Sequence, residues 1–328
     1  MARWILLAAT VCFVATSASA KTRVWIDTDP ACGLSAMSDP DDCFAVLYLL
    51  AAPSIEIAGI STTFGNASVE ETTGVANELL RRWRAPHPRV FPGAGGALSW
   101  WHPSSPTRAS RAIAAALDKG PLTFVALGPL TNLATALRER TNPTANLTEV
   151  VAVMGKKAGE IFHPAEGSPD ALLGHGPAFS DLNFAKDPRA AASVFAAGAP
   201  VTLVPYAAGK TQSITRADLA RLAALGGAPA WVSQEAHGWL DFWRDVVGRD
   251  GFYPFDLVAA IVVGDRRAAI CKPEFVVLKH DDKIGWFGFG PRSLLFSPPA
   301  PGAFPVSTCR ALSVRAADRL ADATASAR

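Results

Sequence analysis

Short apolar runs alternate with longer segments of helical pattern along most of the chain. Short runs rich in β-branched and aromatic residues are typical of buried strands, and longer segments with one apolar side are typical of helices. The predicted strands cover residues 24–26, 55–62, 90–91, 122–127, 150–154, 201–205, 275–279, 284–288 and 306–314. The predicted helices cover residues 44–50, 69–83, 108–118, 131–138, 187–197, 215–225, 231–247 and 256–263. Residues 316–328 are expected to form a short terminal helix or a frayed tail.

This alternation predicts an α/β fold. Parallel strands need a crossover connection, and a helix between successive strands supplies it. We therefore expect a mostly parallel central sheet with helices on both faces, as in Rossmann-like open sheets. The composition does not shift along the chain, and neither a linker nor an internal repeat divides it, so one domain over residues 21–328 is the simpler expectation.

Residues 1–20 have the pattern of a secretory signal peptide. Arg3 precedes an apolar run over residues 4–14, and Ala18-Ser19-Ala20 has the form of a cleavage site. The apolar run is too short for a membrane span. We expect an exported protein, periplasmic or secreted, with an uncleaved N-terminal anchor as the alternative.

The net charge bears on the partners of the protein, and the cysteine spacing bears on whether it has a zinc site or disulfides. The net charge of +2 gives no reason to expect a nucleic-acid or membrane partner. The mature chain keeps Cys32, Cys43, Cys271 and Cys309, whose spacing is not of a zinc-binding type. In an oxidising compartment several pairings are open. A bond between Cys32 and Cys43 would bracket an acidic loop, and two free buried thiols are the alternative.

Aspartates crowd the segment between the first predicted strand and the first predicted helix. They are Asp27, Asp29, Asp39, Asp41 and Asp42, and neither Lys nor Arg occurs between Arg23 and Arg81. Open α/β sheets bind ligands at the carboxyl ends of their strands, which is where these acids fall. Crowded carboxylates must take up a proton or bind a cation, and a set of oxygen ligands suits Ca²⁺ or Mg²⁺. The alternative is a solvated acidic loop whose last two acids only favour the start of the next helix.

More polar residues follow later predicted strands or begin helices. They are Asn66, Asp181, Asn183 and Asp256. Each one alone is typical of a turn or a helix cap. Together, at one edge of one predicted sheet, they are the groups that a metal ion and a polyhydroxylated ligand would need.

Six ordered segments resemble the inosine-uridine preferring nucleoside hydrolase family over nearly all of the mature length. They are Asp27-Thr28-Asp29-Pro30 with Asp41-Asp42, Thr63-Phe64-Gly65-Asn66, Leu127-Gly128-Pro129-Leu130-Thr131-Asn132-Leu133, Met154-Gly155, Asp181-Leu182-Asn183-Phe184-Ala185-Lys186-Asp187-Pro188, and Asp256 at a helix start. The resemblance implies a Ca²⁺-dependent enzyme that hydrolyses the N-glycosidic bond of ribonucleosides, releasing ribose and a free base for purine salvage. It also implies a small-molecule substrate and a possible homo-oligomer.

The resemblance implies metal ligands at four positions of this sequence. Asp29 would bind Ca²⁺ and take a proton from metal-bound water. Asp42 would bind the metal through both carboxylate oxygens, and Leu127 through its main-chain carbonyl. Asp256 would bind both the metal and the ribose.

The resemblance also carries the sugar contacts. Asp41, Asn66 and Asn183 would hold ribose hydroxyls, and Asp181 stands where the family usually has a Glu for the 5′ hydroxyl. His175 replaces the usual Asn before that position.

Two departures concern the catalytic machinery. Residues 31–40 separate acids that the family packs closely, so this loop must fold back for both ends to reach one metal. Phe255 stands where many members have a His that protonates the leaving base. His237 could replace that acid, although a surface histidine is the simpler interpretation.

Aromatic residues are abundant around this position. They are Trp239, Phe242, Trp243, Phe252, Tyr253 and Phe255, with Trp100 and Trp101 in a distant loop. We expect most of them in the core, and one or two, Phe255 first, to stack on the base and make its protonation by solvent easier. A purine offers the larger stacking surface, so the sequence favours purine nucleosides.

Two other functions fit parts of this pattern. An Asp-x-Asp after a first strand also opens haloacid-dehalogenase-type phosphatases, but their second acidic pair is poorly matched by Gly264-Asp265. An exported nucleoside- or sugar-binding protein on the same scaffold, catalytically silent because of the inserted loop or the missing His, is the second alternative.

Overall fold

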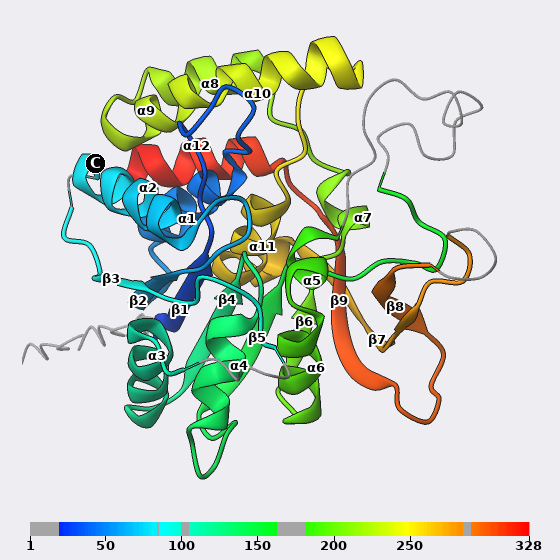
Figure 1. Cartoon of the computed structure of the whole chain (residues 1–328). Helices are drawn as coiled ribbons and strands as arrows, with labels where there is room; N and C mark the ends of the chain where they lie inside the picture. Colours follow the sequence, from blue (N-terminus) through cyan, green and yellow to red (C-terminus); the bar gives the residue numbers. More distant parts are fainter. Residues whose placement is uncertain (1–19, 84, 100–104, 163–180, 285–289, 328) are drawn as a thin grey trace, which may run out of the picture.

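A nine-stranded sheet forms the centre of the computed structural model, which describes residues 20–83, 85–99, 105–162, 181–284 and 290–327 (Figure 1). The strand order is β3-β2-β1-β4-β5-β6-β9-β7-β8. The strands are β1 (Thr22–Thr28), β2 (Ile55–Thr62), β3 (Val90–Pro92), β4 (Leu122–Ala126), β5 (Leu147–Ala152), β6 (Val201–Leu203), β7 (Ala269–His280), β8 (Arg292–Ser297) and β9 (Phe304–Leu312). Pairing is parallel from β3 through to β9, and β7 pairs antiparallel with both β9 and β8.

Helices cover both faces of the sheet (Figure 1). One layer contains α1 (Asp41–Ala51), α2 (Val69–Arg82), α8 (Arg216–Ala223), α9 (Gly227–Glu235), α10 (His237–Phe242), the π-helix η2 (Trp243–Val247), α11 (Phe255–Gly264) and α12 (Ala316–Ser326). The other contains α3 (Arg108–Asp118), α4 (Thr131–Arg138) and α6 (Pro188–Ala196). The short helices α5 (Leu182–Lys186) and α7 (Tyr206–Gly209) and the 3-10 turn η3 (Arg266–Ala268) complete the described elements. A separate buried apolar cluster lies on each face. The prediction of a single α/β domain with a mostly parallel sheet is confirmed.

Local sequence sets several helix starts. Ser68 and Glu71 form a capping box at α2, Thr107 and Ser110 form one at α3, and Thr215 with Asp218 does so at α8. Each box satisfies amide groups of the first turn that have no partner inside the helix. The central strand β4 is buried at every position, as expected for a parallel strand with helices on both sides.

Three predicted elements need correction. The predicted helix at 231–247 starts earlier, at Gly227, and consists of α9, α10 and η2. The predicted strand at 284–288 falls on Ile284, which lies in a bend, and on residues outside the described ranges. The strand of that region is β8, further along the chain, and β7 begins well before the predicted residue 275.

The four cysteines of the described ranges form two disulfides, one of which is the bond between Cys32 and Cys43 considered from the sequence. Cys32 joins Cys43 and Cys271 joins Cys309, which links β7 to β9. The alternative of free buried thiols is therefore wrong. Within the described ranges no helix combines the length and the apolar character needed to cross a bilayer, and the expected signal segment lies almost entirely outside those ranges.

Candidate active site

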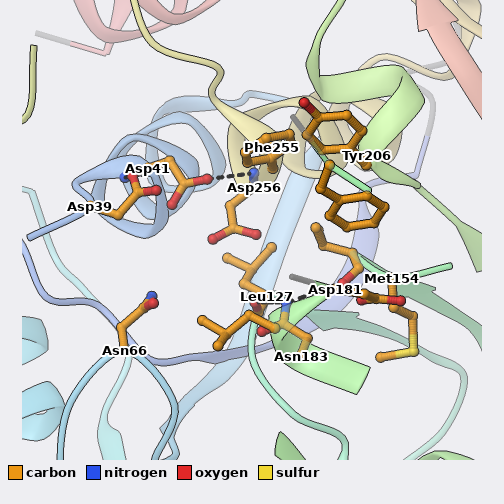
Figure 2. Close-up of a pocket in the computed structure, with 13 residues that line it drawn as sticks. Asp39, Asp41, Asn66, Leu127, Met154, Asp181, Asn183, Tyr206, Phe255 and Asp256 are labelled. Atoms are coloured by element: carbon orange, nitrogen blue, oxygen red, sulfur yellow. Dashed lines mark hydrogen bonds between the residues drawn. The ribbon is translucent and has the colours of Figure 1, made fainter. Parts of the chain in front are cut away.

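A pocket opens at the carboxyl ends of the parallel strands (Figure 2). Its lining residues follow β2, β4, β5 and β6 or begin α1, α5, α7 and α11: Asp39, Asp41, Asn66, Leu127, Val153, Met154, Phe162, Asp181, Leu182, Asn183, Tyr206, Phe255 and Asp256. Figure 2 shows Asp39, Asp41 and Asn66 on one side of this space, Asp181 and Asn183 across from them, and the rings of Phe255 and Tyr206 at a third side. Residues far apart in the sequence therefore meet where open α/β sheets bind ligands.

Asp29 and Asp42 lie just behind the lining, and Asn66 links them. The backbone amide of Asn66 donates to Asp29 Oδ2 at 2.7 Å, and its side-chain amide donates to Asp42 Oδ2 at 3.0 Å. The other oxygen of Asp42 accepts from the backbone amide of Asp29 at 3.1 Å and from the hydroxyl of Thr28. The end of β1 is thus fixed to the start of α1 and to the loop after β2.

Two glycines allow other loops to approach Asp29. A Cβ atom at Gly65 would lie 2.0 Å from Asp29 Oδ2, and one at Gly128 would lie 2.5 Å from Asp29 Oδ1. Real Cβ atoms do not come so close, so both positions require glycine. The requirement explains the glycines of the Phe64-Gly65-Asn66 and Leu127-Gly128-Pro129 segments.

Asp256 brings a further carboxylate from the first turn of α11. Its backbone amide donates to Asp41 Oδ2 at 3.1 Å (Figure 2). The backbone amide of Asp41 in turn donates to Asp39 Oδ1 at 3.1 Å. These contacts join two packed helices, α1 and α11, through their N-terminal turns.

The acidic group is buried and short of positive charge. Oxygen atoms of Asp41, Asp42 and Asp256 all lie within 4.8 Å of one another, and the three residues are at most 4% exposed. Burial raises the pKa of Asp42 to about 7, and the neighbouring Asp41 carboxylate adds to the rise. Burial and then the charge of Asp41 raise the pKa of Asp256 well above its usual range. Burial and the charge of Asp42 do the same to the pKa of Asp29.

A divalent cation would remove this repulsion. Hard oxygen ligands from a buried, converging set are what Ca²⁺ and Mg²⁺ prefer, so the residues fit such an ion. The burial of Asp41 and Asp42 rules out the alternative of a solvated acidic loop. Asp41 belongs to the converging group together with Asp42. The resemblance to the family implied only a sugar contact for Asp41.

Asn183 and Asp181 form the opposite polar part of the pocket. The side-chain amide of Asn183 donates to the carbonyl of Leu127 at 2.6 Å (Figure 2) and to that of Val153 at 3.1 Å. Asp181 Oδ2 accepts from the amide of Gly155 at 2.9 Å. Burial raises the pKa of Asp181 to about 6, against the lowering effect of the Gly155 amide.

Three aromatic rings form the apolar side of the pocket. Phe162 stacks on Tyr206 with ring centroids 4.2 Å apart, and Tyr206 stacks on Phe255 at 5.6 Å. Gly209 makes room for Phe255, because a Cβ atom there would lie 2.0 Å from the ring. We refer to Phe162, Tyr206 and Phe255 as the aromatic wall.

The other predicted aromatics have different places. Trp239, Trp243, Phe252 and Tyr253 are buried in the core, Phe242 stacks on Trp239, and Trp100 and Trp101 lie outside the described residues. His237 does not line the pocket; its Nδ1 contacts the carbonyl of Ser233 at 2.8 Å. Phe255 is therefore the only one of the named aromatics among the described pocket residues.

The structure gathers most of the predicted site. Asp41, Asn66, Leu127, Asp181, Asn183, Phe255 and Asp256 line the pocket, and Asp29 and Asp42 contact Asn66 behind it. His175 lies outside the described residues. Sequence reasoning missed Phe162 and Tyr206 as pocket residues, and it named Asp39 among the crowded acids without giving it a role of its own. The position of Tyr206 directly after the predicted strand at 201–205 was a usable signal.

The family model of the inosine-uridine preferring nucleoside hydrolases matches residues 24–285. This range contains all the pocket residues and all six segments that resemble the family. The chain belongs to this family. Its enzyme class is therefore N-glycosyl hydrolase. A uridine nucleosidase from Arabidopsis thaliana is 29% identical over 257 residues, covering 70% of this chain and 69% of the relative. A non-specific ribonucleoside hydrolase from Salmonella agona is 28% identical over 284 residues, covering 80% and 82%.

Solved nucleoside hydrolases share the fold. A purine-preferring ribonucleoside hydrolase from Gardnerella vaginalis superposes with a TM-score of 0.71 at 19% identity, over 92% of this chain and 99% of that one. A plant nucleoside hydrolase gives a TM-score of 0.70 at 20% identity, over 93% and 98%. These similarities confirm the α/β architecture.

Proposed function

We propose that this nucleoside hydrolase family member cleaves the N-glycosidic bond of ribonucleosides with water, releasing ribose and the free base. The observation that carries the proposal is the pocket itself. Carboxylates and amides line two parts of the pocket and an aromatic wall lines a third, which matches a polyhydroxylated sugar joined to a flat base.

The proposed cofactor is Ca²⁺, held by Asp29, Asp42, Asp256 and the carbonyl of Leu127. The converging oxygens and raised pKa values of the acids support a hard cation at this place. A bound cation supplies Lewis acidity, which lowers the pKa of water near it.

Asp29 is the proposed catalytic base. The water oxygen forms a bond to the anomeric carbon, the bond from that carbon to the base nitrogen breaks, and Asp29 takes the proton of the water. The base leaves with the electron pair of the broken bond. The transition state resembles an oxocarbenium ion, so the surrounding carboxylates stabilise its positive charge.

Sugar recognition falls to the polar side of the pocket. Asp41, Asn66, Asn183 and Asp256 would accept from or donate to the ribose hydroxyls, and Asp181 would accept from the 5′ hydroxyl. The side chains of Asp41, Asn66, Asp181 and Asn183 each make a hydrogen bond to a backbone group or to a neighbouring carboxylate. Asp256 is held through its backbone amide, which donates to Asp41. A buried polar group left without its partner is costly, so sugars without these hydroxyls should be poor substrates.

The aromatic wall is the proposed place of the base. The ring of Phe255 directly precedes Asp256 in sequence and lines the same pocket, which puts a stacking surface beside the sugar site. Stacking favours the larger ring system, so we propose a preference for purine nucleosides, with solvent protonating the leaving base. His175 remains a predicted sugar contact.

Ribose release tests the proposal. Inosine and uridine should each yield ribose with the wild-type protein, inosine faster, and Asp29→Asn should yield none. Binding of inosine without ribose release by the wild type would instead support the catalytically silent binding protein.

We also propose that the protein is exported and begins at or near Lys21. The cleavage-site pattern before Lys21 supports this, as do the two disulfides, because disulfides persist mainly in oxidising compartments. Mass spectrometry of exported material should give that N-terminus, and an intact Met1 would contradict it.

A further inference from the structure

The inserted loop over residues 31–40 is closed by a disulfide next to the acidic group. Cys43 directly follows Asp42 on α1, and Cys32 lies shortly after Asp29 at the end of β1. Both cysteines are at most 1% exposed. The bond therefore connects the two chain segments that carry the first carboxylates of the proposed cation site.

The exposed part of the loop between the cysteines makes few hydrogen bonds. Residues 33–37 are exposed, and their hydrogen bonds are local: Leu34 donates to Ala31, Ser38 donates to Ser35, and the two serine hydroxyls lie 2.9 Å apart. Such a loop has few contacts that resist opening.

The start of α1 lacks the cap that other helices have. Its N-cap residue is Pro40, which provides no side-chain hydrogen bond, whereas α2, α3 and α8 each begin with a capping box. Asp41 and Asp42 occupy this first turn, whose Asp41 amide donates to Asp39 Oδ1 at 3.1 Å. The covalent bond at Cys43 therefore adds a restraint to this turn, in which Asp42 already accepts hydrogen bonds from Thr28, from the amide of Asp29 and from Asn66.

The folded-back loop also fits closely against α10. A Cβ atom at Gly238 would lie 2.3 Å from the carbonyl oxygen of Ala36. On its other side the loop delivers Asp39 to the pocket, where it accepts from the amide of Asp41. The loop therefore contacts α10 at Ala36 and contributes Asp39 to the pocket lining.

We propose that the Cys32–Cys43 disulfide is a positioning element of the cation site, holding Asp41 and Asp42 where their carboxylates converge with Asp256. The inference rests on the proposed binding of Ca²⁺. Groups that orient metal ligands typically contribute about 10- to 100-fold to metal affinity. Loss of this disulfide should weaken Ca²⁺ binding by a factor in that range.

The second disulfide provides a matched control. The test compares Cys32→Ser/Cys43→Ser with Cys271→Ser/Cys309→Ser in the full mature chain, with Ca²⁺ affinity measured by isothermal titration calorimetry. The first variant should bind Ca²⁺ about 10- to 100-fold more weakly. The second, altered at β7 and β9 away from the acids, should keep the wild-type affinity even if its melting temperature falls. Equal affinities for the two variants would overturn the proposal.

A second variant covers the case in which the first does not fold. Cys32→Ala/Cys43→Ala removes the same bond with apolar side chains that suit these buried positions, and it should also weaken Ca²⁺ binding. Unchanged affinity in a folded Cys32→Ala/Cys43→Ala variant would refute the positioning role of the disulfide. If the wild type itself binds no Ca²⁺, the proposed cofactor fails, and ribose release from inosine tests the hydrolase activity independently.

Discussion

Gly209 controls the position of Phe255, and substitution by alanine should disturb the site by a calculable amount. A Cβ atom at Gly209 would lie 2.0 Å from Cδ1 and 2.6 Å from Cε1 of the Phe255 ring. Carbon atoms in contact prefer a separation of about 3.5 to 4.0 Å. Either the ring or α7 must therefore move by about 1.5 Å.

This movement should affect catalysis more than stability. Overpacking a buried position costs about 1 to 3 kcal/mol, which a folded domain tolerates. Phe255 directly precedes Asp256, whose amide contacts Asp41. A displacement of about 1 Å in a catalytic site can cost about 100-fold, so kcat/KM for inosine should fall by about that factor, equivalent to about 2.7 kcal/mol.

Gly74 supplies the control for this substitution. It is exposed on α2, and a Cβ atom there would meet nothing within 4 Å. Gly74→Ala should stabilise the helix by about 0.8 to 1 kcal/mol and leave kcat/KM unchanged. The assay is the absorbance change on inosine cleavage, with urea denaturation for stability. Wild-type kcat/KM in Gly209→Ala would refute the argument that this glycine positions the pocket.

Four further outcomes are expected. Phe255→Ala should slow inosine cleavage much more than cleavage of a nitrophenyl riboside, whose leaving group needs no proton, while Asp29→Asn abolishes both; equal losses for Phe255→Ala would count against aromatic activation. Chelator treatment should abolish activity, and elemental analysis of the untreated protein should find one Ca²⁺ per chain; an active, metal-free protein would contradict the mechanism. Lys156 forms an ion pair with the buried Asp281 at 2.5 Å. Lys156→Met should therefore destabilise the fold by about 3 to 5 kcal/mol, and adding Asp281→Asn should restore part of the loss. A urea-denaturation midpoint of Lys156→Met equal to that of the wild type would disprove this. Finally, KM for inosine should fall as pH rises through about 6, because burial raises the pKa of Asp181 to about that value. Above this pH the ionised carboxylate accepts a stronger hydrogen bond from the 5′ hydroxyl. The same pH dependence of KM for 5′-deoxyinosine, which lacks this hydroxyl, would argue against the prediction.

Strongly patterned elements were predictable from the sequence. The predicted strand at 55–62 and the predicted helix at 108–118 match β2 and α3 at both ends. A short β-branched run marks the extent of the strand, and a capping residue and an amphipathic pattern mark that of the helix. The helix at 231–247 was predicted as one piece because its apolar pattern continues through η2. The structure divides this segment at Ala236 and again at Trp243, where the π-helix begins.

The site was predictable where a motif fixed it and not where the fold alone assembles it. Asp29 and Asp256 lie in recognisable segments, so their convergence could be expected. Tyr206 follows an apolar run whose pattern is typical of the hydrophobic core. It lines the pocket because the chain after β6 places its ring between those of Phe162 and Phe255. Asp39 lies in an inserted loop whose path is set by a disulfide that the sequence left open.

The two edges of the sheet are protected in different ways, and this bears on self-association. At one edge, β3 is only three residues long and ends in Pro92, features that discourage strand addition. At the other, the backbone of Lys156 covers β8, donating to Leu294 and accepting from Phe296, each at 3.0 Å. Lys156 follows the pocket residue Met154 by two positions. A second copy could add a strand at β8 only by displacing the segment that lines the pocket. Aggregation through this edge would therefore inactivate the molecule, and a working homo-oligomer would have to form through its helices or loops.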